Sequence, residues 1–241
     1  TCSIRGKDRV GLIGRSNSAG IIKLDCLGNE GSVEATYQAA AGILGNANDG
    51  SIAYITNCYS TGHIKAGSGK NAAQICGWLG KVGARITNCW STSLIEGYDS
   101  QSKLFCRFSS NTTLTNCFSI DGDGTQAVRK ADYEFASGEI TWELNGKSTE
   151  KPVWFQKLGT DLVPVLFADH GIVVEKDGTF TNMGGDAIEN VEATLGETAS
   201  VYDVQGRLVR PAMPVSQALL GLPHGMYILR GASVSRKVLV K

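Results

Sequence analysis

The chain has 241 residues, 42% of them hydrophobic, and its 23 basic residues balance its 23 acidic ones. This length and composition support a sizeable core in one or two domains. A neutral chain without a basic stripe lacks the electrostatic footprint of a nucleic-acid-binding protein, so no nucleic-acid partner is expected. No apolar run approaches the roughly 18–20 residues that cross a bilayer, so the sequence predicts no transmembrane segment.

The first half of the chain repeats a pattern of short apolar segments. Its glycine-flanked openings lie at residues 10–14, 41–45, 73–77 and 103–107. Each opening leads to a cysteine, and these marker cysteines are Cys26, Cys58, Cys89 and Cys117, at intervals of 32, 31 and 28 residues. A third apolar segment follows at residues 31–35, 62–66 and 93–97.

None of these runs is long enough for a helix, and glycine is frequent inside them. Three short strands in each repeat of about 31 residues predict an all-β fold: a β-solenoid of about four stacked coils, with a right-handed β-helix as the expected form. Residues 1–6 look like the tail of an earlier repeat, so further repeats or a signal segment are expected upstream of Thr1.

Stacked coils place equivalent residues in columns. The marker cysteines are expected to form one inward column of small apolar side chains, with Cys2 as a candidate earlier rung. Cys76 and Cys106 are expected to begin a second column. Disulfides between adjacent rungs are the alternative, because stacked strands bring Cα atoms within bridging range. Seven cysteines leave at least one thiol unpaired within the chain.

The residues beside each cysteine suggest a bend and a surface. Asn57, Asn88 and Asn116, with Asp25 in the first coil, are predicted to form a turn column, because Asn and Asp tolerate left-handed backbone. If the cysteines point inward, strand alternation turns the next residues outward. These are Tyr59, Trp90 and Phe118, which would form an exposed strip for sugar rings or a protein partner. The alternative is that the rings fill the core or pack beneath a neighbouring domain.

These repeats resemble a known family. The openings VGLIG, AGILG and AQICG, followed by the T-N-C-aromatic-S step, are similar to the GLUG-type repeats of bacterial surface proteins over residues 1–125. The last repeat departs from the pattern, because Arg107 replaces the glycine. The resemblance implies a secreted or surface-exposed adhesin whose repeats carry no catalytic residues.

Residues 126–174 break the repeat and are expected to cap the solenoid. Residues 137–146 predict a short helix, with Ser137 as its N-cap, Ile140 and Leu144 on one face and Gly146 after its end. Residues 153–156 and 164–167 are predicted strands that close the open end of the stack.

Residues 175–241 alternate as strands and predict a small antiparallel β-sandwich. The predicted strands are residues 199–204, 206–210, 225–230 and 236–241. Hairpin turns are expected at Gln205-Gly206 and at residues 222–225. The run from VYDVQGRLV to the basic last strand resembles the C-terminal sorting domains of type IX secretion in Bacteroidetes. The resemblance implies export to the outer-membrane surface or beyond, with the secretion machinery as a partner of residues 199–241. The alternative is a small accessory sandwich without a sorting role.

The remaining chemistry is sparse. His63, His170 and His224 lie in three different regions, and neither a C-x-x-C spacing nor a zinc-finger histidine occurs. Asp121 and Asp123 have carboxylates spaced for calcium but lack the further ligands of an EF-hand loop. The charged residues Glu34, Lys65 and Glu96 alternate in sign across coils, which stabilises a stack as cross-strand pairs.

The sequence therefore predicts a non-enzymatic, exported cell-surface protein without a cofactor. Its solenoid would act as an adhesin or ligand-binding stalk, with host glycans or surface proteins as partners, and its last domain would serve export or anchoring. The alternative is a carbohydrate-active β-helix enzyme, a polysaccharide lyase or glycosidase, or a fragment of one.

Overall fold

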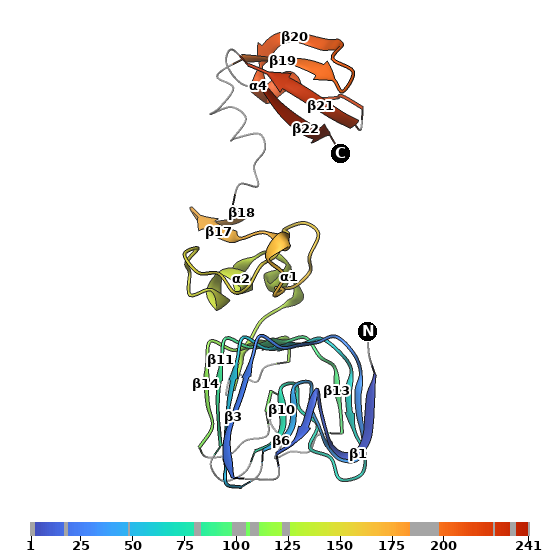
Figure 1. Ribbon diagram of the computed structural model, residues 1–241, viewed down its shortest axis with the longest axis vertical. Helices are drawn as coiled ribbons and strands as arrows, with labels where there is room; N and C mark the ends of the chain where they lie inside the picture. The colour runs from blue at the N-terminus through green and yellow to red at the C-terminus, as the bar shows by residue number, and fades with distance from the viewer. Residues whose placement is uncertain are drawn as a thin grey trace. The chain divides into compact units, whose positions relative to one another are not determined.

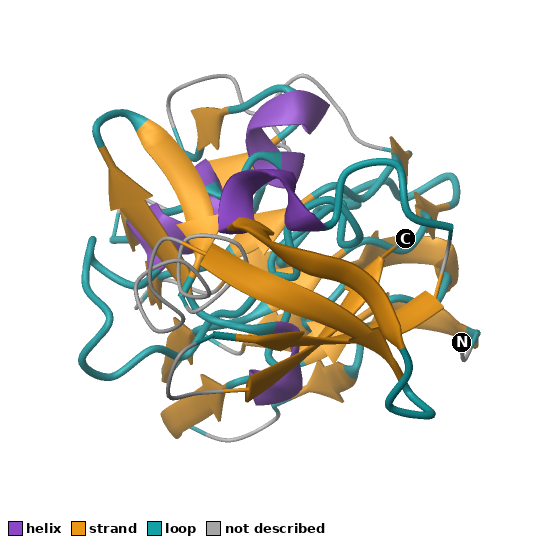
Figure 2. Ribbon diagram, turned by 90° about the horizontal axis from the view of Figure 1, so that it is seen from above, coloured by secondary structure: helices purple, strands orange, loops and turns teal. Residues whose placement is uncertain are grey.

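The computed structural model describes residues 3–16, 19–47, 49–79, 83–97, 105–106, 111–121, 126–183, 198–223, 225–231 and 235–240. The chain forms two compact units, Thr1–Phe180 and Thr181–Lys241. Strands dominate both units, and the helices are few and short (Figure 2).

The first unit begins with a parallel β-solenoid, seen in cross-section in Figure 1. The first three coils each add one strand to four parallel sheets, which we call A to D. Sheet A holds β1 (Ile4–Val10), β5 (Val33–Ala40), β9 (Ile64–Ala66) and β13 (Ile95–Glu96). Sheet B holds β2 (Ile13–Arg15), β6 (Leu44–Ala47) and β10 (Cys76–Leu79). Sheet C holds β3 (Gly20–Asp25), β7 (Ser51–Thr56), β11 (Ala84–Thr87) and β14 (Thr113–Thr115). Sheet D holds β4 (Gly28–Asn29), β8 (Tyr59–Ser60), β12 (Trp90–Ser91), β15 (Phe118–Ser119) and β16 (Val128–Arg129).

The predicted β-solenoid and its period are confirmed. Ile55 of β7 pairs with Ile86 of β11, 31 residues further on. The chain completes about three turns of this length, one fewer than predicted, and parts of a fourth passage lie outside the described residues. The prediction of three strands per coil was one too few. The two-residue strands of sheet D follow the cysteine step, and a run that short gives no periodicity to read.

Sheet B runs through the inside of the coil. In Figure 1, β6 and β10 stand between the wall that contains β3, β11 and β14 and the wall that contains β1 and β13. Apolar residues pack on both sides of sheet B, with Ile43 and Ile55 in one core and Val33 and Ile64 in the other. A Cβ atom on Gly45 would lie about 2.5 Å from the backbone of Arg9, so the glycine of the repeat opening allows this close approach.

The first coil is shifted by one residue from the predicted alignment. Asp25 pairs with Thr56, which places Cys26 beside Asn57 and Leu27 beside Cys58. Cys26 is exposed, so its assignment to the inward column is wrong. The error arises because the first coil reads D-C-L-G where the others read N-C-aromatic-S, and matching the cysteines displaces the bend.

After the solenoid come α1 (Asp132–Ala136), α2 (Glu139–Leu144), a 3-10 helix (Ala168–His170), and the hairpin of β17 (Val173–Lys176) and β18 (Thr179–Asn182). The predicted helix is confirmed as α2, with Ile140 and Leu144 both buried. Its N-cap residue is Gly138, but the Ser137 hydroxyl does accept a hydrogen bond from the Glu139 N–H. Helix α1 and the hairpin were not predicted. The two strands expected to close the stack reduce to a single antiparallel bridge between Phe155 and Val165.

The second unit is a four-stranded antiparallel sheet in the order β20-β19-β21-β22. Its elements are β19 (Thr198–Asp203), β20 (Leu208–Pro214), α4 (Val215–Ala218), β21 (Gly225–Arg230) and β22 (Ser235–Val240). The turn at Gln205-Gly206 is confirmed, since the Asp203 N–H bonds to the Arg207 carbonyl. The segment 222–225 joins α4 to β21 and is therefore not a hairpin turn. Helix α4 packs against this sheet, because its Val215 and Ala218 share one apolar core with Val201 and Leu229 of the strands.

Candidate functional site

The aromatic rings after the cysteines form a column on sheet D. Tyr59 pairs with Trp90, and Trp90 with Phe118. The rings of Tyr59 and Trp90 stack with centroids 5.0 Å apart and an interplanar angle of 9°. The rings point out of the coil, as strand alternation predicts, because the adjacent cysteines lie in the solenoid core.

The expected exposed strip is nevertheless wrong, because the segment after the solenoid covers it. The exposed fractions of Tyr59, Trp90 and Phe118 are 4%, 0% and 5%. Phe135 of α1 lies 5.6 Å from Trp90 between ring centroids, and Trp154 lies 6.0 Å from Tyr59. The segment predicted to close the end of the stack therefore packs on its side wall. Among the described residues of this segment, only β16 adds a rung to the solenoid, by pairing with β15. These rings hold two parts of the unit together and offer no free face to a sugar.

Tyr59 is also fixed at its hydroxyl end. Its O–H donates to the Glu30 carboxylate over 2.8 Å. Burial, and then this hydrogen bond, raise the pKa of Tyr59 well above its usual range. The tyrosine is therefore neutral at physiological pH and serves as a donor.

The predicted turn column is confirmed at its three asparagines. Asn57, Asn88 and Asn116 have φ values of 51°, 52° and 53°. The Asn116 amide donates to the Asn88 side-chain oxygen over 2.8 Å, and the Asn57 amide donates to the Asp25 carboxylate over 3.0 Å. Cys26, with a φ of 55°, occupies the bend of the first coil that was assigned to Asp25. These two bonds join neighbouring coils at the bend, so the asparagine column has a structural role.

The cysteine column is confirmed for Cys58, Cys89 and Cys117, which are all buried. The Cys89 thiol donates to the Ile55 carbonyl and the Cys117 thiol to the Ile86 carbonyl, each over 3.6 Å. Burial raises the pKa of Cys89 well above its usual value and that of Cys117 to about 12. Thiols that stay protonated are weak nucleophiles and poor metal ligands.

The second cysteine column is also confirmed, because Cys76 and Cys106 pair across adjacent coils. All six described cysteines are free thiols, whereas Cys2 lies outside the described residues.

A column of buried polar residues on sheet D was not predicted. It consists of Asn29, Ser60, Ser91 and Ser119. The Ser91 hydroxyl donates to the Ser60 carbonyl over 2.8 Å, and the Ser119 hydroxyl donates to the Gln74 side chain over 2.7 Å. The sequence signal was present, since a serine follows the aromatic residue in three repeats.

Charged side chains form a further column on sheet A. Glu34 pairs with Lys65 in register, and Lys65 with Glu96. The Lys65 ammonium lies 3.2 Å from the Glu96 carboxylate, and Arg5 lies 3.1 Å from Glu34. The predicted alternation of sign is confirmed, and Arg5 of β1 continues it into the first coil.

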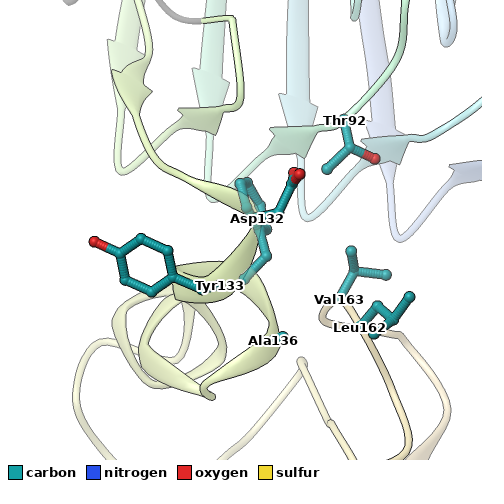
Figure 3. Close-up of a pocket in the computed structure, with 7 residues that line it drawn as sticks. Thr92, Asp132, Tyr133, Ala136, Leu162 and Val163 are labelled. Atoms are coloured by element: carbon teal, nitrogen blue, oxygen red, sulfur yellow. The ribbon is translucent and has the colours of Figure 1, made fainter.

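An open pocket of about 430 Å³ lies where α1 and the segment before the 3-10 helix meet the end of a solenoid strand (Figure 3). It is lined by Thr92, Asp132, Tyr133, Phe135, Ala136, Leu162 and Val163. The Asp132 carboxylate and Thr92 lie on one side, and Leu162 and Val163 face them (Figure 3). The Asp132 carboxylate makes no hydrogen bond or ion pair with any other described residue. The pocket thus combines an available carboxylate with an aliphatic wall, and nothing in the repeat pattern predicts it.

The other candidate residues do not gather into a site. His63 lies 3.1 Å from Glu96, and His170 lies 2.7 Å from Asp161, in separate regions. Asp123 of the suggested calcium pair lies outside the described residues, as does His224. Within the part of the chain that the structure describes, no three His, Cys, Asp or Glu side chains cluster as metal ligands would. That same part contains no helix of the length and apolarity needed to traverse a bilayer.

Comparison with protein-family models, with curated proteins and with solved structures finds no match to this chain. Any function proposed for this chain therefore rests on its fold and on the contacts between its residues.

Proposed function

We propose that the chain is a non-enzymatic protein of the bacterial cell surface whose first unit is a recognition module. The observation that carries the proposal is that the recurring polar groups are used to build the stack. The asparagine, thiol, serine and charged columns bond from one coil to the next. The pocket beside α1 is built differently, because its carboxylate at Asp132 is left for a ligand.

The ligand that we propose for the pocket is a sugar ring of a surface glycan. A sugar presents an apolar face of C–H groups and an edge of hydroxyl groups. Leu162 and Val163 would pack against the apolar face, and the Asp132 carboxylate would accept hydrogen bonds from hydroxyl groups opposite. A pocket that combines an apolar lining with a few placed polar groups is the usual form of a small-ligand site.

A glycan array probed with the full-length chain tests this ligand. We expect saturable binding to at least one glycan, and at least a roughly tenfold loss of affinity in Asp132→Asn and Leu162→Ser, since tenfold corresponds to about 1.4 kcal/mol. Leu220→Ser is the matched control, because Leu220 is 67% exposed in the second unit and Leu162 is 75% exposed. Binding to no glycan, or equal binding by all four proteins, would rule out this site.

The same incubations separate recognition from catalysis. We expect every bound glycan to be recovered intact. The release of unsaturated or reducing sugar would instead favour the alternative function, a polysaccharide lyase or glycosidase built on a β-helix.

The proposal also assigns export or anchoring to the C-terminal residues. The support is the resemblance of residues 199–241 to type IX sorting domains, and that of residues 1–125 to GLUG-type repeats of surface proteins. Fusion of residues 175–241 to a periplasmic reporter, in a Bacteroidetes host that uses type IX secretion, is expected to carry the reporter to the cell surface. A reporter that stays in the periplasm would leave these residues as an accessory domain.

A further inference from the structure

Sheet C forms one wall of the coil, in which β3, β11 and β14 are labelled in Figure 1. Its strands turn Ala53, Ile55 and Ile86 into the core, so strand alternation turns the residues between them outward. The outward residues pair from coil to coil and therefore form two columns. The first column is Lys23, Tyr54, Arg85 and Thr113. The second column is Asp25, Thr56, Thr87 and Thr115.

The first column sets a tyrosine between two cations. Lys23, Tyr54 and Arg85 are all exposed, with 39% of the tyrosine accessible to solvent. Neither Lys23 nor Arg85 makes an ion pair with any described residue. The charged column on sheet A is different, because each of its cations has a carboxylate in the next coil. The two charges on sheet C are therefore free to bind an acidic partner.

The backbone holds the Arg85 side chain in place. Its Nη1 donates to the Ala84 carbonyl over 3.1 Å and to the Asn111 carbonyl over 2.6 Å. Its other two nitrogen atoms have no hydrogen-bond partner among the described residues. A fixed, planar guanidinium with free N–H groups is suited to a carboxylate. The acidic residue of the second column, Asp25, accepts a hydrogen bond from the Asn57 amide at the bend.

The spacing of the column matches a chain of sugars. Neighbouring strands of a sheet lie about 4.8 Å apart, so Lys23 and Arg85 are separated by two spacings, ~10 Å, with Tyr54 between them. An extended chain of pyranose rings advances by a similar length for each sugar. Carboxylates on the first and third sugars would meet the two cations, and the C–H face of the middle sugar would pack on the tyrosine ring. The threonine hydroxyls of the second column would lie beside the same chain.

We propose that the outer face of sheet C binds a linear polysaccharide in which an acidic sugar alternates with a neutral one. The chain lies along the solenoid axis and crosses the coils at Lys23, Tyr54 and Arg85. A nucleic acid fits this face less well, because its binding depends on many phosphate contacts and the column supplies two cations. The inference goes beyond the proposed function and does not depend on it, since it concerns a different surface from the pocket beside α1.

Hexasaccharides of hyaluronan and of unsulfated chondroitin test the face, because both alternate a glucuronate with a neutral N-acetylated sugar. Titration calorimetry with the full-length chain should show saturable binding of at least one of them. Binding should weaken as salt is added, because the charges are exposed to solvent. Chitohexaose, whose sugars are all neutral, should bind at least roughly tenfold more weakly. Binding of neither acidic hexasaccharide, or equal binding of chitohexaose, overturns the proposal.

Substitutions in the column locate the site. Lys23→Ala removes one charge and Tyr54→Ala removes the packing surface, and each should lower the affinity at least roughly threefold. The matched controls are Lys7→Ala and Tyr37→Ala on sheet A, since Lys7 is exposed and Tyr37 is 45% exposed. The controls should bind as the wild type does. Equal losses in the sheet A variants would mean that sheet C is not the site.

Two further measurements separate this face from other sites and other partners. Asp132→Asn should bind the acidic hexasaccharides as the wild type does. A loss of binding in this variant would assign the acidic glycan to the pocket beside α1, and would overturn the assignment to sheet C. A thymidine oligonucleotide should bind at least roughly tenfold more weakly than the better hexasaccharide. Equal or tighter binding would make the face a general site for polyanions, which contradicts the proposed preference for a glycan.

Discussion

At the scale of single residues, the bend column shows how backbone geometry selects a side chain. Three of the four bends carry asparagine, which adopts left-handed backbone at little cost, and the first carries Cys26 with a φ of 55°. The buried side-chain oxygen of Asn57, next to Cys26 in the column, has no hydrogen-bond partner among the described residues. The bend of the first coil therefore carries the residue least suited to left-handed backbone.

Cys26→Asn should stabilise the protein. An asparagine fits the left-handed backbone better than a cysteine, and its side-chain oxygen would accept from the Asn57 amide, as the Asn88 oxygen accepts from the Asn116 amide. We expect the free energy of unfolding to rise by about 1 kcal/mol, measured by urea denaturation. Cys26→Ser is the control, because it removes the thiol without supplying an amide. If the two variants behave alike, the backbone argument is wrong.

The free thiols should differ sharply in reactivity. Among the described cysteines only Cys26 is exposed, so one thiol should react rapidly with a disulfide reagent in the native Cys2→Ser protein. Burial, and then the charge of Asp25, raise the pKa of Cys26, so this reaction should accelerate as pH rises from 7 to 9, and Asp25→Asn should speed it at fixed pH. At least five thiols of the wild-type chain should titrate after denaturation without reductant. Finding only one would indicate a disulfide framework.

At the scale of elements, the aromatic column joins sheet D to the segment that contains α1 and α2. Trp90 has no exposed surface and contacts rings from the solenoid and from the segment. The stacking of Tyr59 on Trp90 continues the coil repeat, whereas Phe135 and Trp154 come from outside it. The contact is thus a side-wall interface within one unit.

Trp90→Ala should cost about 3–5 kcal/mol of stability, the range for deleting a buried aromatic ring. Amides of α1 and α2 should lose protection against hydrogen exchange before those of sheet C, because the segment loses its main contact. Tyr133→Ala is the matched control, since Tyr133 is 74% exposed and its removal should change stability by less than about 0.5 kcal/mol. Equal losses in the two variants would refute this interface.

The segment that contains α1 and α2 should also lose stability in acid. The Ala131 N–H and then Lys130 lower the pKa of Glu134, and Lys130 also contacts Glu139 of α2. A carboxyl whose pKa is lower in the folded state adds stability above its unfolded pKa of about 4.3, and this is lost as pH falls through the folded pKa. The helical signal should therefore decline below about pH 4. The Glu134→Gln variant should be less stable than the wild type at pH 6. Its helical signal should change less between pH 6 and pH 3. An unchanged profile would exclude Glu134.

At the scale of the whole molecule, the chain divides into two units with separate cores. The first holds the solenoid and its side segment, and the second holds the sheet in which Val201 and Leu229 are fully buried. The predicted boundaries at residues 125/126 and 174/175 followed changes in composition. The contacts place the division at Phe180 and Thr181, after most of the β17–β18 hairpin.

The second unit should fold without the first. Residues 181–241 expressed alone should give amide NMR signals that overlay those of the same residues in the full chain, because their apolar core lies within the unit. Calorimetry of the full chain should resolve two transitions. Collapsed signals from the isolated residues would mean that the second unit needs the first.

Much of the fold could be predicted because a structural repeat leaves a recurring pattern in the sequence. A period of about 31 residues places Ile55 beside Ile86, and from that register follow the columns of asparagine, cysteine and alternating charge. The first coil was aligned wrongly, because matching Cys26 to the other marker cysteines shifts the register by one residue. The pocket could not be predicted, since Thr92, Asp132 and Leu162 come from three segments without a shared pattern.

The coil, its period and the direction of the repeated side chains after the first coil follow from the amino-acid sequence, because they depend on local strand alternation and on pairing between identical positions. What each outward face packs against becomes visible in the three-dimensional structure alone. Tyr59, Trp90 and Phe118 point out of the coil as alternation requires, yet Phe135 and Trp154 cover them. Alternation fixes the side of a strand on which a residue lies, whereas burial depends on packing against segments far along the chain.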